Sequence, residues 1–184
     1  LSMNFIKYIL FLIPTVIYSQ NDQWSVYMTP SEVHKQLSDY IGKFDIEVKM
    51  WMETSKEPMI VTAKSTNKMT LGERFLEMSQ SGDMMGMNYQ ASSILGYNTI
   101  SKEFTFTNIT NMGTGTLTLI GKWVEEGKSI DLKGQMVNPE NNALIDVRQV
   151  ITFLGKDHFL VENFDKFSDG PERKSIEYSY SRSK

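Results

Sequence analysis

A group of tyrosines and two arginines are the side chains in this sequence best suited to binding a small molecule. Tyrosine offers an apolar ring and an orienting hydroxyl, and arginine grips a carboxylate or phosphate through paired hydrogen bonds. The alternative is that the tyrosines fill a core and the arginines form structural ion pairs with Glu73, Glu77 or Glu162. The candidate ligand-binding residues of these two types are Arg74, Tyr89, Tyr97, Arg148, Tyr178 and Tyr180.

Methionines gather around the glycine-containing segment Ser81-Gly82-Asp83, which we expect to be a loop. They are Met78, Met84, Met85 and Met87. Flexible thioethers pack in cores, suit apolar ligands at a cavity mouth and can bind Cu(I). Their spacing matches no metal-ligand set, so we predict no metal site and no cofactor, and we add Met87 to the ligand-binding candidates.

The two histidines, His34 and His158, lie in neither a His-x-His nor a His-Glu pattern. His158 follows a predicted turn, which indicates either an exposed residue or a single axial haem ligand. The sequence contains no nucleophile elbow, phosphate loop or dinucleotide fingerprint. Catalytic residues therefore remain unknown, and the sequence favours a protein that is not an enzyme.

Composition excludes several function classes. The chain has 184 residues, 19 basic and 22 acidic side chains, and a formal net charge of −3. No Lys/Arg block provides the electrostatic surface of a nucleic-acid binder. The absence of cysteine excludes disulfides, thiolate metal sites and a cysteine nucleophile.

The first 19 residues are predicted to be a secretory signal peptide. A short basic region, Asn4–Lys7, precedes the apolar stretch Tyr8–Ile17, and Ser19 offers a cleavage position. A membrane-spanning helix needs about 20 apolar residues. We expect an exported protein, periplasmic or secreted, without a stable membrane anchor after cleavage; a buried amino-terminal helix is the alternative.

A short helix is predicted at 29–42, after a linker at 20–28. Thr29 is expected to be the N-cap, with Pro30 at the first helical position and Glu32 completing a capping box. One apolar stripe then follows at helical spacing: Val33, Leu37, Tyr40 and Ile41. Such a helix either closes a barrel as a plug or covers a cavity as a lid.

From about residue 44 to 182 the chain is a train of alternating polar and apolar runs, separated by Gly, Asn, Asp and Pro clusters. This pattern predicts an all-β fold: an antiparallel up-and-down β-barrel of lipocalin type with about ten strands, forming one domain at 29–184. A two-sheet sandwich is the alternative architecture.

An ordered set of short motifs resembles the bacterial family known as domain of unknown function 1579. The set covers roughly residues 30–182. It comprises Leu71-Gly72-Glu73-Arg74-Phe75-Leu76, Gly86-Met87, Ile94-Leu95-Gly96-Tyr97-Asn98, Asn111-Met112-Gly113-Thr114-Gly115, Gly121, Val147-Arg148 and Tyr178-Ser179-Tyr180-Ser181-Arg182. The chain departs from the family pattern at Glu73, Asn98 and Phe44. The resemblance implies a lipocalin-like barrel and no particular activity.

Three functions remain open from the sequence. A binding module would hold a small apolar or amphipathic ligand inside the barrel. An isomerase or hydrolase would use a Tyr/Arg/carboxylate set there, with Glu77 or Glu162 as the acid. A structural or interaction protein would have a filled barrel and an apolar surface patch around Trp24, Trp51 or Trp123.

Overall fold

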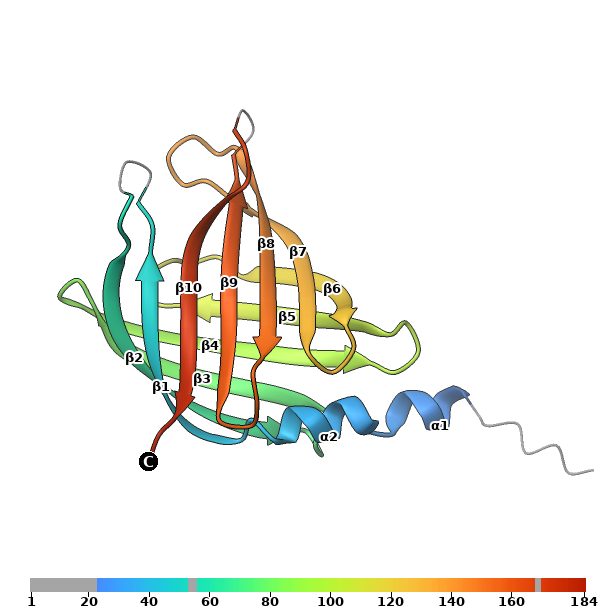
Figure 1. The fold of residues 1–184 in the computed structure, drawn as a ribbon. Coiled ribbons are helices and arrows are strands. Elements are labelled where there is room, and N and C mark those ends of the chain that lie inside the picture. Colours follow the sequence, from blue (N-terminus) through green and yellow to red (C-terminus); the bar gives the residue numbers. More distant parts are fainter. Residues whose placement is uncertain (1–22, 53–55, 168–169) are drawn as a thin grey trace, which may run out of the picture.

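The computed structural model describes residues 23–52, 56–167 and 170–184 (Figure 1). These residues form two helices, α1 (Gln23–Met28) and α2 (Glu32–Ser38), followed by ten strands. The strands are β1 (Gly42–Met50), β2 (Met59–Thr70), β3 (Phe75–Met84), β4 (Met87–Asn98), β5 (Glu103–Thr110), β6 (Leu117–Glu125), β7 (Ser129–Val137), β8 (Leu144–Phe153), β9 (His158–Lys166) and β10 (Arg173–Arg182). The predicted signal peptide lies outside the described residues. Among those residues, no helix has the length and apolar character needed to span a bilayer.

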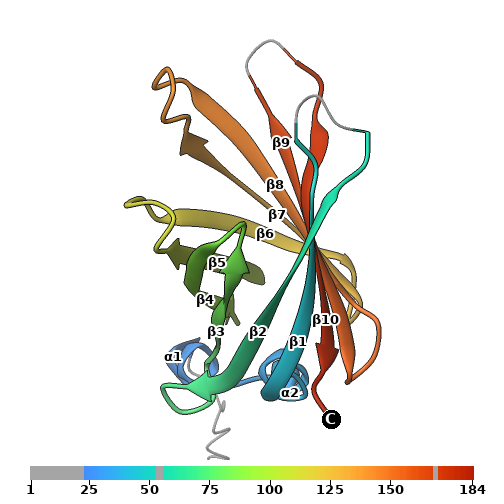
Figure 2. The ribbon, with the colours of Figure 1, turned by 90° about the vertical axis from the view of Figure 1, so that its left-hand side faces the viewer.

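The sheet closes on itself. Each strand pairs antiparallel with the next along the chain, and β1 also pairs with β10. Closure leaves no unpaired strand edge. Figures 1 and 2 show β3–β5 running across the direction of β8–β10, as strands on facing walls of a tilted barrel do. The predicted barrel is therefore confirmed and the sandwich alternative is wrong.

The two ends of the barrel differ. We call the end that carries α1, α2 and the turns β2–β3, β4–β5, β6–β7 and β8–β9 the helix end. The opposite end, which carries the turns β1–β2, β3–β4, β5–β6, β7–β8 and β9–β10, is the distal end. Figure 1 shows α2 crossing beneath the strands at the helix end.

Alternation along each strand decides what faces inward. In β1, Phe44, Ile46 and Val48 are buried, whereas Asp45 and Glu47 between them are exposed. Successive side chains point to opposite faces of a strand, so the buried set lines the interior. The other strands bury alternate residues in the same way, which explains why periodicity alone predicted them.

Aromatic rings and α2 fill the helix end. Tyr40, just after α2, lies 4.7 Å from Phe153 between ring centroids. Phe159 stacks on Tyr180 at 4.1 Å. Leu37 of α2 is fully buried against this cluster. The helix therefore packs as a plug that completes the core.

The predicted start of this helix was wrong. Ser31, not Thr29, is the N-cap, and His34 occupies the third helical position. The Nδ1 atom of His34 accepts a hydrogen bond from the Ser31 N–H at 3.0 Å, the role expected of Glu32. The Thr29 hydroxyl instead donates to the Ser25 carbonyl at 2.6 Å, at the end of α1. The helix predicted at 29–42 is thus shortened to 32–38, and residues 23–28 of the predicted linker form α1.

The loop predicted at Ser81-Gly82-Asp83 was also wrong, because these residues continue β3. The turn lies further on, at Met85 and Gly86, whose φ angles are 59° and 81°. The Asp83 carboxylate accepts a hydrogen bond from the Gly86 N–H at 2.7 Å. Positive φ at both central positions matches the twist of a tight hairpin, and this favours the two-residue turn over a longer loop.

Arg182, near the end of β10, ties the helix end together. Its guanidinium donates to the carbonyls of Asp39, Ile41 and Lys156, each at 2.7 Å, and to the Asp157 carboxylate at 2.7 Å. The same group lies 4.7 Å from the centre of the Phe44 ring. One side chain thus joins the last strand to the end of α2 and to the β8–β9 turn.

We expect Arg182→Lys to lower the free energy of unfolding by about 2 kcal/mol, because an ammonium group cannot reproduce a planar fork that serves several acceptors. Chemical denaturation measures this. The matched control is Arg148→Lys on the outer wall, where we expect a loss below about 1 kcal/mol. Equal losses in the two variants would contradict a special role for Arg182.

Candidate functional site

The interior of the barrel contains a belt of polar side chains between the aromatic helix end and the distal end. They occupy positions where alternation would place apolar residues. Those that are buried or half-buried are Ser65, Asn67, Gln80, Tyr89, Ser93, Asn108, Gln149, Asn163, Asp165, Tyr178 and Tyr180. Buried polar groups require partners, so the pairing within this belt shows which of them are structural.

One part of the belt is a satisfied chain of three side chains. The Tyr89 hydroxyl donates to Gln80 Oε1 at 3.1 Å, and Gln80 Nε2 donates to the Tyr180 hydroxyl at 2.9 Å. Burial raises the pKa of Tyr89 and raises that of Tyr180 well above its usual range. Both hydroxyls therefore stay protonated at neutral pH, where they act as hydrogen-bonding groups.

A second part of the belt is not satisfied. Gln149 of β8 and Asn163 of β9 are directly opposite each other in the antiparallel ladder. Neither Gln149 Nε2 nor Asn163 Oδ1 has a hydrogen-bond partner among the described residues. Gln149 is only 2% exposed. This pair thus presents a donor and an acceptor side by side on the inner wall.

Inward-facing side chains in the distal half of the barrel are not fully covered. Inward-facing side chains there keep partial exposure although strands surround them: Val61, Leu117, Asn163, Ile176 and Tyr178 are all half-buried. Their counterparts at the helix end, such as Phe44 and Phe104, are completely buried. Inward-facing side chains toward the distal end are therefore less covered than those at the helix end.

An acid and a hydroxyl also face this distal half. Asp165 stands opposite buried Val147 in the ladder, which places it on the inner face. Burial raises the pKa of its carboxyl, and this effect outweighs the Ser175 hydrogen bond and the Arg173 charge, which lower it. Burial likewise raises the pKa of Tyr178. Such a pair could exchange a proton with a bound molecule.

Of the predicted ligand-binding residues, Tyr89, Tyr178 and Tyr180 meet inside the barrel, but Arg74 does not join them. Arg74 lies at the helix end, where it donates to the carbonyls of Leu71 at 3.1 Å and Gly72 at 2.9 Å, and to that of Met28. It shares with Tyr97 a pocket of about 300 Å³ beneath the α1–α2 link. Its hydrogen bonds hold that link and the β2–β3 turn in place.

Arg148 faces outward. It binds the Glu172 carboxylate through two hydrogen bonds, of 2.9 and 2.7 Å, and lies 4.1 Å from the centre of the Phe164 ring. The structural ion pair was expected with Glu73, Glu77 or Glu162; its partner is Glu172. Glu77 and Glu162 pair instead with Lys68 and Lys174, at 3.3 and 2.6 Å.

The methionine group separates into two environments. Met78 and Met84 are buried in the core, whereas Met85 and Met87 are exposed at the β3–β4 turn. Met87, predicted to bind ligand, continues the inward-facing register of Tyr89 at the distal end of β4, where its side chain is exposed. Met52 is likewise exposed at this end, just after β1.

Neither histidine offers a free ring nitrogen to the interior. His158 lies on the outer face, with Nδ1 at 3.2 Å from the Ser181 hydroxyl. His34 accepts from Ser31 and hydrogen-bonds the Tyr97 backbone. Burial lowers the pKa of His34, and the Arg74 charge lowers it further. No group of three His, Asp or Glu residues suited to a metal ion occurs within the described parts of the chain.

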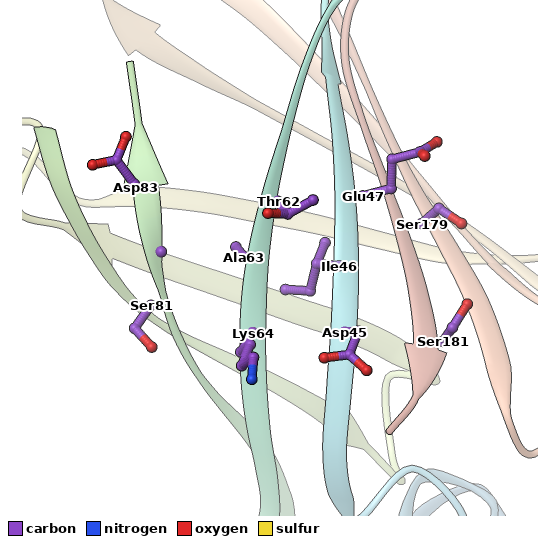
Figure 3. A pocket seen from close by; sticks show the side chains of 11 residues that line it. Asp45, Ile46, Glu47, Thr62, Ala63, Lys64, Ser81, Asp83, Ser179 and Ser181 are labelled. Carbon is purple, nitrogen blue, oxygen red and sulfur yellow. The ribbon is translucent and has the colours of Figure 1, made fainter. Parts of the chain in front are cut away.

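A surface hollow of about 810 Å³ lies on the outer wall, over β10, β1, β2 and β3 (Figure 3). Outward-facing side chains line it, among them Asp45, Glu47, Lys64 and Ser181. They are exposed to solvent, so the hollow lacks the enclosed apolar lining that concentrates binding energy in ligand sites. The interior belt is the stronger candidate site.

The tryptophans are dispersed. Trp24 is exposed on α1, Trp51 lies at the distal end with Lys174 Nζ 5.3 Å from its ring centre, and Trp123 packs among the inner aromatic rings. An apolar surface patch around Trp24, Trp51 or Trp123 was the feature expected of an interaction protein. Trp24 has such neighbours, because its ring contacts that of Tyr27 on α1 and Val26 and Met28 beside it are also exposed.

Sequence reasoning missed eight residues of the belt: Ser65, Asn67, Gln80, Ser93, Asn108, Gln149, Asn163 and Asp165. Their signal was present, since each polar side chain continues the inward-facing register of an otherwise apolar series. In β8, Gln149 stands between Val147 and Ile151, both of which are buried. A polar residue on the apolar face of a strand is the pattern to search for.

Comparisons with known proteins identify the fold and family. A family model described as "Protein of unknown function (DUF1579)" matches residues 29–182. None of the curated proteins matches the chain. The crystal structure of Rv2717c from M. tuberculosis is similar, with a TM-score of 0.59 and 13% identity over 85% of this chain and all 100% of that one; this likeness concerns the fold alone. A redesigned β-barrel aligns with 81% of this chain and 96% of its own at 9% identity and a TM-score of 0.43, too low to support an argument.

The inner tyrosines make stability sensitive to alkaline pH. Because the folded state raises the pKa of Tyr89, Tyr178 and Tyr180, the unfolded chain releases these protons first as pH rises. We expect the free energy of unfolding to be unaffected by them below pH of about 10 and to fall above it by about 1.4 kcal/mol per pH unit for each such tyrosine.

Denaturant unfolding between pH 8 and pH 11 measures this dependence, and Tyr178→Phe should flatten the alkaline fall. The variant's unfolding free energy at pH 8 serves as its own reference, since any packing change persists at all pH values. Parallel curves for the variant and the original protein above pH 10 would contradict the prediction.

Proposed function

This chain belongs to the DUF1579 family, whose description assigns no activity, and we propose that it is a binding protein that holds a small apolar or amphipathic molecule inside its barrel. The observation that carries this proposal is the partial exposure of inward-facing side chains in the distal half. A solvent-accessible, largely apolar interior with a few polar groups is the usual form of a ligand site.

The construction of the two ends supports one entry route. At the helix end, α2 and the aromatic cluster are packed together, and Leu37 and Phe44 are fully buried. At the distal end, methionines border the opening: Met50 and Met59 are half-buried, and Met87 is exposed. Flexible thioethers adapt to apolar ligands of varied shape, so they suit an entrance.

The enzyme alternative retains one supporting feature, the Asp165 carboxyl near Tyr178. The raised pKa of Asp165 suits proton transfer closer to neutral pH. Against it, Arg74 and Arg148 hold structural contacts elsewhere, so the predicted Tyr/Arg/carboxylate set does not assemble. A turnover that Asp165→Asn abolishes while ligand binding persists would favour this alternative.

We also propose export, on the strength of the Tyr8–Ile17 stretch. Native mass spectrometry of the protein from its own host tests both proposals together. We expect a chain that begins at Gln20 and carries a bound small molecule, which is released when the protein is denatured. Protein that always emerges without a bound molecule would count against the binding function, and a chain that retains residues 1–19 would count against export.

A bulky substitution tests whether an apolar dye binds inside the barrel or on its outer wall. Val61 and Ile60 are neighbours on β2 that face opposite sides, inward and outward. We expect Val61→Trp to weaken binding of the neutral apolar dye Nile red at least about tenfold by filling the distal half, because one lost apolar side-chain contact is worth 1–3 kcal/mol. Ile60→Trp, the matched control, should bind the dye as the original protein does.

Dye fluorescence titrations measure the affinities, and circular dichroism confirms that both variants are folded. Equal binding by the two variants would place the dye on the outer surface and contradict the proposed site.

A further inference from the structure

The amide pair Gln149 and Asn163 has surroundings that explain why it is unpartnered. Gln149 stands opposite Leu132 on one side and Asn163 on the other, and its own strand presents Val147 and Ile151 on the same face. Apart from Asn163, whose Oδ1 is itself without a partner among the described residues, these side chains offer neither donor nor acceptor. The belt tyrosines do not help, since Gln80 already bonds both Tyr89 and Tyr180.

An arrangement of this kind destabilises the protein by itself. Leaving a buried donor or acceptor unpaired costs free energy that a hydrogen bond would recover, whereas an apolar side chain of the same shape avoids the cost. The two unmatched groups are of opposite kinds, a donor on Gln149 and an acceptor on Asn163, and they occupy adjacent positions of the ladder. A ligand group with an acceptor and a donor side by side would satisfy both.

The surroundings of the two amides also favour an uncharged ligand group. The positions around the amides are apolar, so a charged head placed between them would lose its hydration without a counter-ion. The charged groups near this wall, Asp165 and Arg173, face each other across β9 and β10 one step closer to the distal end. A charged head would have to stop there, short of the amides.

We propose that the ligand carries a neutral head that both donates and accepts hydrogen bonds, such as a carboxamide, and that Gln149 and Asn163 bind this head. This inference rests on the proposed binding function. The head lies against the inner faces of β8 and β9, and the apolar part of the ligand extends toward the distal end along Val61, Leu117 and Ile176.

The experiment compares three small-molecule probes of the same hydrocarbon length that differ only in the polar head group: decanamide, decanoate and decylamine. Each competes with Nile red for the full-length protein, below the concentration at which it forms micelles. We expect decanamide to bind at least about tenfold more tightly than either charged probe. Its head can hydrogen-bond both buried amides, and it carries no charge that would lose its hydration inside the barrel.

Apolar variants of similar size test the residues. Gln149→Met and Asn163→Leu should reduce the amide preference to below about threefold. Gln149→Met should also raise the melting temperature of the unliganded protein by about 2–4 °C, because it removes an unpaired buried group. Gln90→Met, an exposed glutamine on the outer face of β4, is the control and should change neither quantity.

The outcomes separate the two proposals. If Nile red and all three probes fail to bind, the binding function itself is overturned, and this inference with it. If the probes bind but decanoate or decylamine equals decanamide, the binding function stands and the neutral-head assignment is overturned. A melting temperature that falls in Gln149→Met would show that Gln149 has a structural partner, which overturns the assignment as well.

Discussion

The closed end of this barrel depends on the guanidinium of Arg182. It lies on the Phe44 ring and reaches the carbonyls that end α2 and the β8–β9 turn. Those carbonyls have no partner within their own element, so a rigid cation with several donors is the group that satisfies them together. With this end sealed, β1 and β10 are held in register.

The interior polar groups fall into two classes: those whose hydrogen bonds join strands, and those that remain unpaired. Gln80 uses both ends of its amide to join β4 and β10 across the barrel, which fixes Tyr89 and Tyr180. Gln149 and Asn163 make no comparable contribution among the described residues and leave polar atoms unpaired. Stability alone would favour apolar residues at the second pair, since an unpaired buried amide costs about 1–3 kcal/mol. The ligand head proposed above would supply the partners that the fold does not provide for this pair.

Sequence predicted the barrel well because alternation is a local property. Strands such as Ser129–Val137 and Arg173–Arg182 could be placed from their own residues. The contacts of Arg74, Arg148 and His34 could not, because their partners Met28, Glu172 and Tyr97 are distant in sequence or lie across a turn. Alternation along β8 places Arg148 and Gln149 on opposite faces, but only the closed barrel shows that Gln149 lies between Leu132 and Asn163.

If the proposed binding function holds, fold and ligand choice are encoded by different residues of the same strands. The barrel needs apolar side chains at alternate positions, and many sequences meet that requirement, as the 13% identity shared with Rv2717c illustrates. Polar side chains at these inward-facing positions are what distinguishes one such barrel from another, since each lowers the stability of the fold unless a hydrogen-bond partner satisfies it. For this chain the exceptions that the fold leaves unsatisfied are neutral amides, not the arginines that the sequence suggested. The neutral, hydrogen-bonding head proposed above is the ligand chemistry that such a wall would complement.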